Sequence, residues 1–332
     1  MKNLQRVIGA LRHEPVDRIP VTGFLTSVNM EMMERCGFTW DQAHDNADKL
    51  VELAAAAHNQ CGLETLKLPF DMTVEAEALG GKINPGDSDT LPQLISHLYS
   101  EPDELNFDRD LLTCGRIPVV LKAINMAKSR YDGEAAVVSS IVGPFTLGTR
   151  LFGIDNFLIW SIAETEKIHA AMSRLNRLCM MYAGEQVAAG CDVVLIGEAA
   201  SSGDLISSDI YRDYIMPYHR ELCNSFSAPS VVHICGNITG HLPYVAETGM
   251  TAISFDGKTD VGEACRLLKG KTALVGYVDT MNTLLHGNPD DVYQSSADCI
   301  NAGVDLLNAG CAWPAHIPTE NILAMVKAAT EN

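Results

Sequence analysis

Residues 165–197 read TEKIHAAMSRLNRLCMMYAGEQVAAGCDVVLIG. Apolar side chains recur every three or four positions from Thr165 to Ala188, and this spacing predicts an amphipathic helix. After a short turn comes Val193–Gly197, a run of β-branched and apolar residues that is typical of a buried strand. A long helix joined to a short buried strand is one step of a βαβ unit, and such units build parallel sheets.

The same alternation recurs through nearly the whole chain, and no linker interrupts it. Eight strands are predicted, at Ile19–Phe24, Thr65–Leu68, Ala136–Val142, Val193–Gly197, Ser230–Ile234, Ala252–Phe255, Ala273–Tyr277 and Val304–Asn308. Further helices are predicted at Asn46–His58, Ile117–Arg130, Asp209–Phe226, Gly240–Glu247, Pro289–Ala302 and Thr319–Ala329. This pattern favours an α/β fold, a single (β/α)8 TIM barrel formed by one domain over residues 1–332. An open doubly wound sheet remains the alternative, because periodicity does not show whether a sheet closes.

One long connection follows the second predicted strand. Met72–Cys114 is rich in Gly, Pro and Asp, and we expect it to carry a small hairpin. Long loops after barrel strands usually lie at the active-site end. The insertion is therefore expected near the site, and the sequence leaves open whether it closes over the mouth.

The bulk composition excludes several classes of protein. With a formal net charge of −18 and a pI near 4.8, and with no cluster of Lys and Arg, the chain is not expected to bind nucleic acid. The first segment, Met1–Leu11, has helical spacing rather than the features of a signal peptide, and no run reaches the roughly 18 apolar residues of a membrane span. We expect a cytoplasmic protein without membrane contact. The glycine fingerprints of nucleotide-binding folds are missing, as are the G-x-S-x-G and H-E-x-x-H motifs.

Ten cysteines is a high number for such a protein, yet they sit singly, without the dense spacing of a disulfide scaffold. Free cysteines in helical patterns are usually buried as small hydrophobic residues. We expect this for Cys36, Cys61, Cys179, Cys191, Cys223, Cys265 and Cys299.

The first candidate functional residues lie in the segment Val231-Val-His-Ile-Cys-Gly236. Strand side chains alternate between two faces, so His233 and Cys235 point to the same side, at the strand end where barrel active sites are built. Cys311 follows the predicted eighth strand, and closure of a barrel would bring it to the same mouth. Two thiolates and one imidazole suit tetrahedral Zn²⁺, and three protein ligands leave a position for substrate. The alternative is a satisfied core histidine beside a buried strand cysteine.

These residues resemble the zinc motif of the methylcobamide:coenzyme M methyltransferases, a branch of the uroporphyrinogen decarboxylase superfamily. The resemblance spans most of the chain and includes Glu14-Pro-Val-Asp-Arg-Ile-Pro-Val21, Leu68-Pro-Phe70, Glu77-Ala-Leu-Gly80, Gly143-Pro-Phe-Thr146, Pro217, His233-Ile-Cys-Gly236, Asn308-Ala-Gly-Cys311 and Pro318-Thr-Glu-Asn321. The first and last pieces are shared broadly. The H-x-C sequence and the distal cysteine mark the zinc methyltransferase branch.

The resemblance implies a zinc-dependent methyltransferase of one-carbon metabolism. In that family, zinc held at the positions of His233, Cys235 and Cys311 binds the thiol of coenzyme M, and the methyl group comes from a methylated corrinoid on a partner protein. Zinc coordination deprotonates a thiol whose pKa of about 8.5 otherwise keeps it protonated at neutral pH. The thiolate can then attack the methyl carbon on Co(III). The three residues are thus the predicted zinc ligands and catalytic residues, with a methylcorrinoid as methyl donor.

The sequence departs from this family at the fourth zinc position. Some members offer a glutamate there when substrate is absent, whereas this chain has Gly257, preceded by Asp256. Asp256, Glu198 and Asp279 are candidate carboxylates at the same mouth, as ligands or as hydrogen-bonding residues. We do not assign them as metal ligands.

An anionic tail on the thiol would need hydrogen-bond donors. Arg150, Lys258 and His316 lie in predicted loops after strands, where we expect solvated surface residues. Backbone N–H groups of the loops are alternative donors.

Other functions stay open. A uroporphyrinogen-type decarboxylase would need no metal, but Gly23–Asn29, which corresponds to the arginine-rich motif of those enzymes, has no arginine. A corrinoid methyltransferase could use a different acceptor, such as a folate or another thiol. A non-catalytic corrinoid- or metal-binding module is disfavoured by the open coordination position and by the lack of a D-x-H-x-x-G motif.

Overall fold

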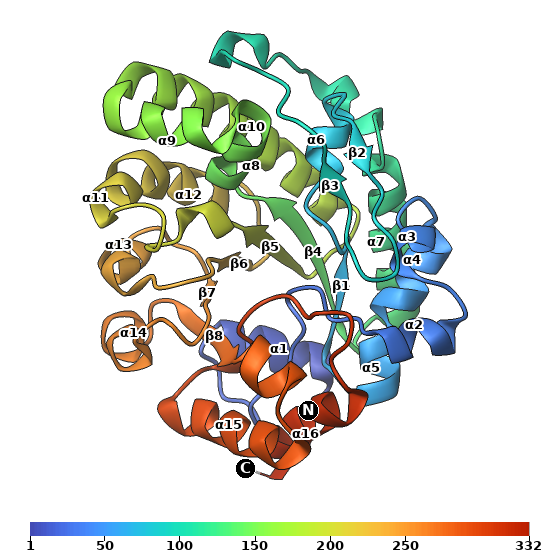
Figure 1. Cartoon of the computed structure of the whole chain (residues 1–332). Helices are drawn as coiled ribbons and strands as arrows, with labels where there is room; N and C mark the ends of the chain where they lie inside the picture. The colour runs from blue at the N-terminus through green and yellow to red at the C-terminus, as the bar shows by residue number, and fades with distance from the viewer. Residues whose placement is uncertain (332) are drawn as a thin grey trace.

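A computed structural model describes residues 1–331 as a curled parallel sheet surrounded by helices (Figure 1). The main sheet contains β1 (Thr65–Leu68), β4 (Ala136–Val142), β5 (Val193–Gly197), β6 (Ser230–His233), β7 (Ala252–Ser254), β8 (Ala273–Val278) and β9 (Leu306–Ala309). The longer helices are α1 (Asn3–Leu11), α4 (Ala47–Ala54), α7 (Ile117–Tyr131), α8 (Pro144–Phe152), α9 (Ile154–Ala163), α10 (Thr165–Ala188), α12 (Met216–Cys223), α14 (Val261–Leu268), α15 (Pro289–Ala302) and α16 (Thr319–Glu331).

Shorter elements fill the connections. The short α-helices are α2 (Met30–Cys36), α3 (Trp40–Ala43), α5 (Ala56–Cys61), α6 (Val74–Ala78), α11 (Ser208–Ile210) and α13 (Leu242–Val245). The 3-10 helices are η1 (Pro102–Glu104), η2 (Arg109–Thr113), η3 (Ala199–Ser201) and η5 (Thr239–His241), and the π-helices are η4 (Tyr211–Ile215) and η6 (Thr280–Leu285).

Neighbouring strands of the main sheet also follow one another along the chain, in the order β1-β4-β5-β6-β7-β8-β9, and every pair is parallel. The register places all C-terminal strand ends at one end of the barrel: Gly197 of β5 is opposite His233 of β6, and His233 is opposite Ser254 of β7. The predicted α/β barrel is confirmed.

The segment predicted as the first strand, Ile19–Phe24, closes the ring without forming a regular strand. Val21 makes an isolated parallel bridge to Leu307 of β9, and the Val21 carbonyl accepts the N–H of Glu64 just before β1 at 2.9 Å. A strand over the whole predicted range is therefore wrong. The reason lies in the backbone donors. Pro20 has no N–H, and the N–H groups of Val21, Gly23 and Phe24 donate to side chains, so that only Thr22 donates to the backbone of β9.

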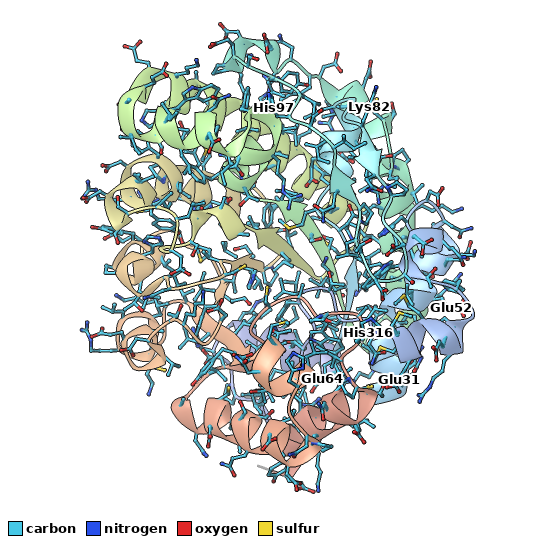
Figure 2. All side chains as sticks on the ribbon, in the orientation of Figure 1. Glu31, Glu52, Glu64, Lys82, His97 and His316 are labelled. Carbon is cyan, nitrogen blue, oxygen red and sulfur yellow. The ribbon has the colours of Figure 1, made fainter. Side chains whose placement is uncertain are left out.

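The insertion after β1 carries the expected hairpin, formed by the antiparallel strands β2 (Ile83–Asn84) and β3 (Gln93–Leu94). Trp40 Nε1 donates to the carbonyl of Asp87 in the hairpin turn at 2.5 Å. On the other side, His316 Nε2 lies 3.0 Å from Asp89 Oδ1. The hairpin thus contacts α3 and the C-terminal loop that contains His316, the residue labelled in Figure 2.

Alternate residues of the strands fill two apolar layers. Val193 and Leu195 of β5 pack inside the barrel, together with Val7 and Leu11 of α1. Their neighbours on the same strand pack between the sheet and the helices. Burial on both faces explains why the strands read as continuous apolar runs.

Within residues 1–331, no helix has the length and apolar character needed to cross a membrane. The cysteines predicted to be buried follow that expectation with two exceptions. Cys36 and Cys265 are half-buried, whereas the buried ones are Cys61, Cys179, Cys191, Cys223 and Cys299.

Candidate metal centre

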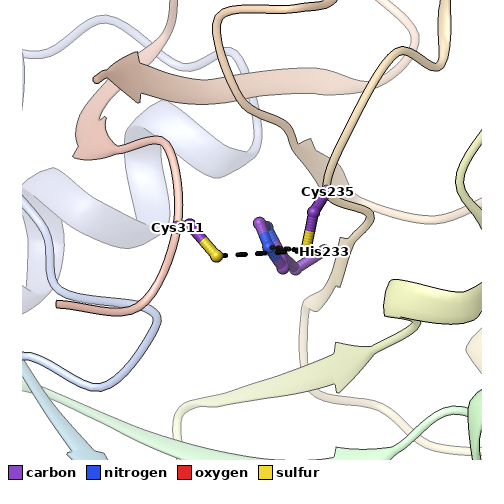
Figure 3. Close-up of side chains that lie close together, drawn as sticks. All are labelled: His233, Cys235 and Cys311. Carbon is purple, nitrogen blue, oxygen red and sulfur yellow. Dashed lines mark hydrogen bonds between the residues drawn. The ribbon is translucent and has the colours of Figure 1, made fainter. Parts of the chain in front are cut away.

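Three side chains converge at the C-terminal end of the barrel (Figure 3). His233 is the last residue of β6, Cys235 lies two residues further on, and Cys311 lies two residues beyond the end of β9. Cys235 Sγ is 3.3 Å from His233 Nε2 and 3.9 Å from Cys311 Sγ. Among residues 1–331 this is the one group of His, Cys, Asp or Glu found close enough together for a metal, with ligand atoms within 4.8 Å of one another.

The donor set and its spacing fit a zinc ion. Zn–S bonds of about 2.3 Å and Zn–N bonds of about 2.0 Å at tetrahedral angles put two sulfurs about 3.8 Å apart and a sulfur and a nitrogen about 3.6 Å apart. The separations of 3.9 Å and 3.3 Å lie close to both values. A small adjustment of side chains would therefore accommodate zinc.

The turn after Cys235 requires a glycine. Gly236 has φ of 78°, and a Cβ there would lie 2.2 Å from Ser202 Oγ and 2.6 Å from an oxygen of Asp204. Asp256 Oδ2 accepts the N–H of Gly236 at 2.7 Å. The backbone that carries Cys235 is thus fixed from two sides.

His233 and Cys311 are also held by hydroxyl groups. Ser254 Oγ lies 3.0 Å from His233 Nδ1, so the other ring nitrogen, Nε2, faces the thiols. The N–H of Cys311 donates to Thr280 Oγ1 at 3.1 Å. These contacts restrict the orientation of the donor atoms.

The two thiols perturb one another. A hydrogen bond from Cys235 lowers the pKa of Cys311 below its ordinary value, an effect that outweighs burial and is reinforced by His233. The same hydrogen bond, together with burial, raises the pKa of Cys235. One sulfur of the pair is therefore readily available as a thiolate, the form that binds a metal.

The three donors face a cavity of about 270 Å³. Much of its wall is apolar and includes Leu25, Phe70, Ile141, Val142 and Leu195. Leu91, Pro92 and Gln93 of the hairpin insertion also line it. The insertion therefore covers part of the mouth, a point that the sequence left open.

Charged residues line the same cavity, and the sequence analysis did not identify three of them, Lys67, Asp71 and Glu75. Lys67 of β1 is buried and its Nζ donates to the carbonyl of Pro69, and burial lowers the pKa of Lys67 to about 8. Glu75 of α6 accepts the N–H of Val142 at 2.8 Å, and burial raises the pKa of Glu75 to about 7. The sequence did contain an indication that Lys67 could face the interior, because Lys67 lies in the predicted strand Thr65–Leu68, in which every second side chain faces inward.

The structure brings none of the three candidate carboxylates into the donor cluster, which is described within residues 1–331. Glu198 is fully buried, lies 2.9 Å from His219 Nε2 and accepts an N–H from the first turn of α8. Asp279 caps η6 through backbone N–H groups. The two oxygens of Asp256 accept the N–H groups of Gly236 and Lys258. Each carboxylate is thus engaged in holding the backbone or a neighbouring side chain.

Of the three candidate donors to an anionic tail, one lines the cavity. Arg150 lies in α8, not in a loop, and it donates to the carbonyl of Met72 at 3.0 Å. The expectation of a solvated surface role is wrong for Arg150, because α8 begins directly after β4 and brings it to the cavity. It is confirmed for Lys258 and His316, whose side chains are 68% and 66% exposed.

A parallel barrel with one imidazole and two thiols at its C-terminal end defines the class of protein, a barrel enzyme with a candidate site for a soft metal. The family model for uroporphyrinogen decarboxylase (URO-D) matches residues 2–332. The chain belongs to the uroporphyrinogen decarboxylase family.

Within this family the chain is more similar to methyltransferases than to decarboxylases. It is 31% identical to the methylated-thiol–coenzyme M methyltransferase of Methanosarcina mazei, covering 100% of this chain and 90% of the relative. It is 32% identical to the methylcobamide:CoM methyltransferase MtbA of the same organism, covering 98% and 96%. The uroporphyrinogen decarboxylase of Anaeromyxobacter dehalogenans is 24% identical over 97% of each chain. The resemblance inferred from the H-x-C motif is confirmed.

Solved structures agree with this grouping. A methyltransferase from Methanosarcina mazei superposes with a TM-score of 0.96 at 32% identity, covering 100% of this chain and 99% of that one. A B12-independent methionine synthase from a Shewanella strain reaches a TM-score of 0.62 at 13% identity, covering 95% and 97%. The second likeness shows the fold alone.

Proposed function

We propose that this protein moves a methyl group from a methylated corrinoid to the sulfur of a small thiol, coenzyme M, at a zinc ion held by His233, Cys235 and Cys311. The observation that carries the proposal is the convergence of these three soft donors on one cavity. Relatives named for methyl transfer to coenzyme M, at 31% and 32% identity, support the choice of reaction.

The protein residues would fix the metal and leave room for substrate. His233, Cys235 and Cys311 supply three donors, and the fourth position of a tetrahedral site would face the cavity that all three line. Zinc held by these residues would keep a substrate sulfur deprotonated at neutral pH, and donation from two cysteinates would leave that sulfur strongly nucleophilic. The apolar wall excludes water from the reacting sulfur.

The transfer balances without an added oxidant or reductant. A sulfur–carbon bond forms while the carbon–cobalt bond breaks, and both electrons of the broken bond remain on cobalt, which passes from Co(III) to Co(I). The thiol proton is lost when the sulfur becomes a thiolate. We infer that a partner protein carries the corrinoid, since relatives are named for methylcobamide. We propose the cytoplasm as the compartment of the reaction.

The tail of the thiol would lie against the charged part of the cavity. Lys67 and Arg150 both line it, and both are largely removed from solvent. A cation shielded from water holds an anion more strongly than an exposed one does. These two side chains therefore suit a sulfonate or another small anionic group.

The activity is tested by following the spectrum of methylcobalamin with coenzyme M and with uncharged thiols. We expect demethylation that depends on coenzyme M and on zinc. Cys311→Ala should reduce the rate by orders of magnitude, because the metal loses one of three ligands. Cys265→Ala is the matched control, since Cys265 is also half-buried and lies in α14. Full activity in Cys311→Ala, or in metal-free protein, would overturn the proposal.

A further inference from the structure

The two strands between the ligand-bearing strands contribute no donor to the metal cluster. In the sheet, β7 and β8 lie between β6, which ends at His233, and β9, which precedes Cys311. Residues at the ends of β7 and β8 instead touch the segments that carry the donors. The ends of β7 and β8 therefore support the segments that carry the donors and supply no donor themselves.

The contact of Ser254 with His233 is the most direct. The two residues are opposite one another in the register of β6 and β7, and both side chains face the inside of the barrel. Ser254 is fully buried and His233 is 3% exposed, so neither exchanges its partner readily for water. Ser254 Oγ is 3.0 Å from Nδ1, and Nε2 is 3.3 Å from Cys235 Sγ.

We propose that Ser254 is a positioning residue that keeps the proton of His233 on Nδ1, so that Nε2 is free to bind the metal. This inference rests on the proposed zinc site. A neutral imidazole carries a proton on one nitrogen only, and the nitrogen that binds a metal must lack it. The hydroxyl oxygen of Ser254 accepts the Nδ1–H and favours that tautomer. Outer partners of ligating histidines commonly act in this way.

The choice of a hydroxyl has an electrostatic consequence. With Zn²⁺ bound, the two half-buried cysteinates would balance the two positive charges of the metal, and Ser254 adds no further charge. A carboxylate in the place of Ser254 would leave the site with a net negative charge, which is costly to bury. A serine orients the ring without that cost.

The alternative is that Ser254 is only a small residue that fills the barrel interior next to Ala252 of the same strand. An alanine would then serve equally well. Thr280, just after the end of β8, makes a comparable contact. Its Oγ1 accepts the N–H of Cys311 at 3.1 Å, so a hydroxyl group also supports the segment that carries Cys311.

The test measures zinc binding by competition with a chelator, using the full chain. Ser254→Ala should weaken zinc binding by about 10- to 100-fold, the usual effect of losing an outer partner. Ser254→Thr, which keeps the hydroxyl, should restore most of the affinity. Ser296→Ala is the matched control, because Ser296 is a fully buried serine in α15 whose hydroxyl lacks a partner within residues 1–331.

A spectroscopic readout separates positioning from packing. In wild-type protein loaded with ¹¹³Cd, nitrogen NMR should show coupling of the metal to Nε2 of His233 and a proton on Nδ1. Unchanged zinc affinity in Ser254→Ala, or coupling to Nδ1 in the wild type, overturns the inference while leaving the zinc site in place. Wild-type protein that binds no zinc overturns the proposed function itself. Should Ser254→Ala not fold, the wild-type NMR result decides.

Discussion

At the scale of single residues, strand alternation identified His233 and Cys235 as a pair. The hydrogen bonding to β7 continues one residue beyond the end of β6, where the N–H of Ile234 donates to the carbonyl of Ser254. The approach of Cys311 depended on ring closure and on family resemblance, since its partner lies far away in sequence. Lys67 and Arg150 were missed or misjudged because a lysine or arginine is usually solvated. The cavity that removes them from water is a property of the folded chain.

Lys67 provides a pH-dependent prediction. Burial lowers the pKa of Lys67 to about 8, so its positive charge is present below that pH and lost above it. If the ammonium holds the anionic tail, KM for coenzyme M should rise as the pH passes 8, while kcat changes little. Lys67→Met should raise KM by about 10- to 100-fold, as expected for a lost charge-assisted hydrogen bond, and should remove this pH dependence. Lys122→Met, on the exposed face of α7, is the control.

A KM that rises above pH 8 in Lys67→Met just as in the wild type would show that another group titrates.

Glu75 provides a prediction for stability. Burial raises the pKa of Glu75 from 4.5 to about 7, so the folded state keeps a proton that the unfolded state loses between these pH values. The stability associated with Glu75 is present below pH 4.5 and is lost as the pH rises through 7, by about 3 kcal/mol for a shift of this size. Urea unfolding should therefore show Glu75→Gln gaining stability over the wild type at pH 8 and not at pH 4. An equal difference at both pH values would exclude this origin.

At the scale of elements, local patterns predicted the regular parts well. The helices α10 and α15 and the strands β1, β4 and β5 begin and end where the periodicity places them. The predicted strand at Ile19–Phe24 was wrong in extent, because competition between backbone and side-chain acceptors is decided by tertiary contacts. Helix α9 was not predicted, and its isoleucines at 154, 159 and 162 are exposed although they are apolar. Such a helix lacks the contrast between two faces on which prediction relies.

The turn that follows Cys235 is an element whose geometry can be tested. Gly236→Ala and Gly270→Ala both place a side chain at positive φ, which costs about 1 kcal/mol. Only Gly236 has close neighbours, since nothing lies within 4 Å of a Cβ at Gly270. We expect Gly236→Ala to weaken zinc binding and to lower the Tm more than Gly270→Ala does. Chelator competition and thermal unfolding measure the two effects. Equal behaviour of the variants would mean that the turn does not position Cys235.

At the scale of the whole molecule, the repeated βαβ units predicted a parallel barrel. Closure of that barrel explains how residues far apart in sequence meet at one site. The segment around Val21 closes the ring between β9 and β1, and the ends of β6 and β9 then face one cavity. The hairpin insertion, attached through Trp40 and His316, covers part of the mouth. The cavity wall carries side chains of both charge types, with Lys67 of β1 and Arg150 of α8 near Asp71 and Glu75.

The central claim is that a thiol substrate binds through sulfur to zinc held by His233, Cys235 and Cys311. X-ray absorption at the zinc edge of the loaded protein tests it directly. Without substrate, we expect two sulfur neighbours at about 2.3 Å and nitrogen or oxygen neighbours at about 2.0 Å. With coenzyme M, the number of sulfur neighbours should rise from two to three. A count that stays at two after coenzyme M is added, or a protein that holds no zinc, would contradict the account.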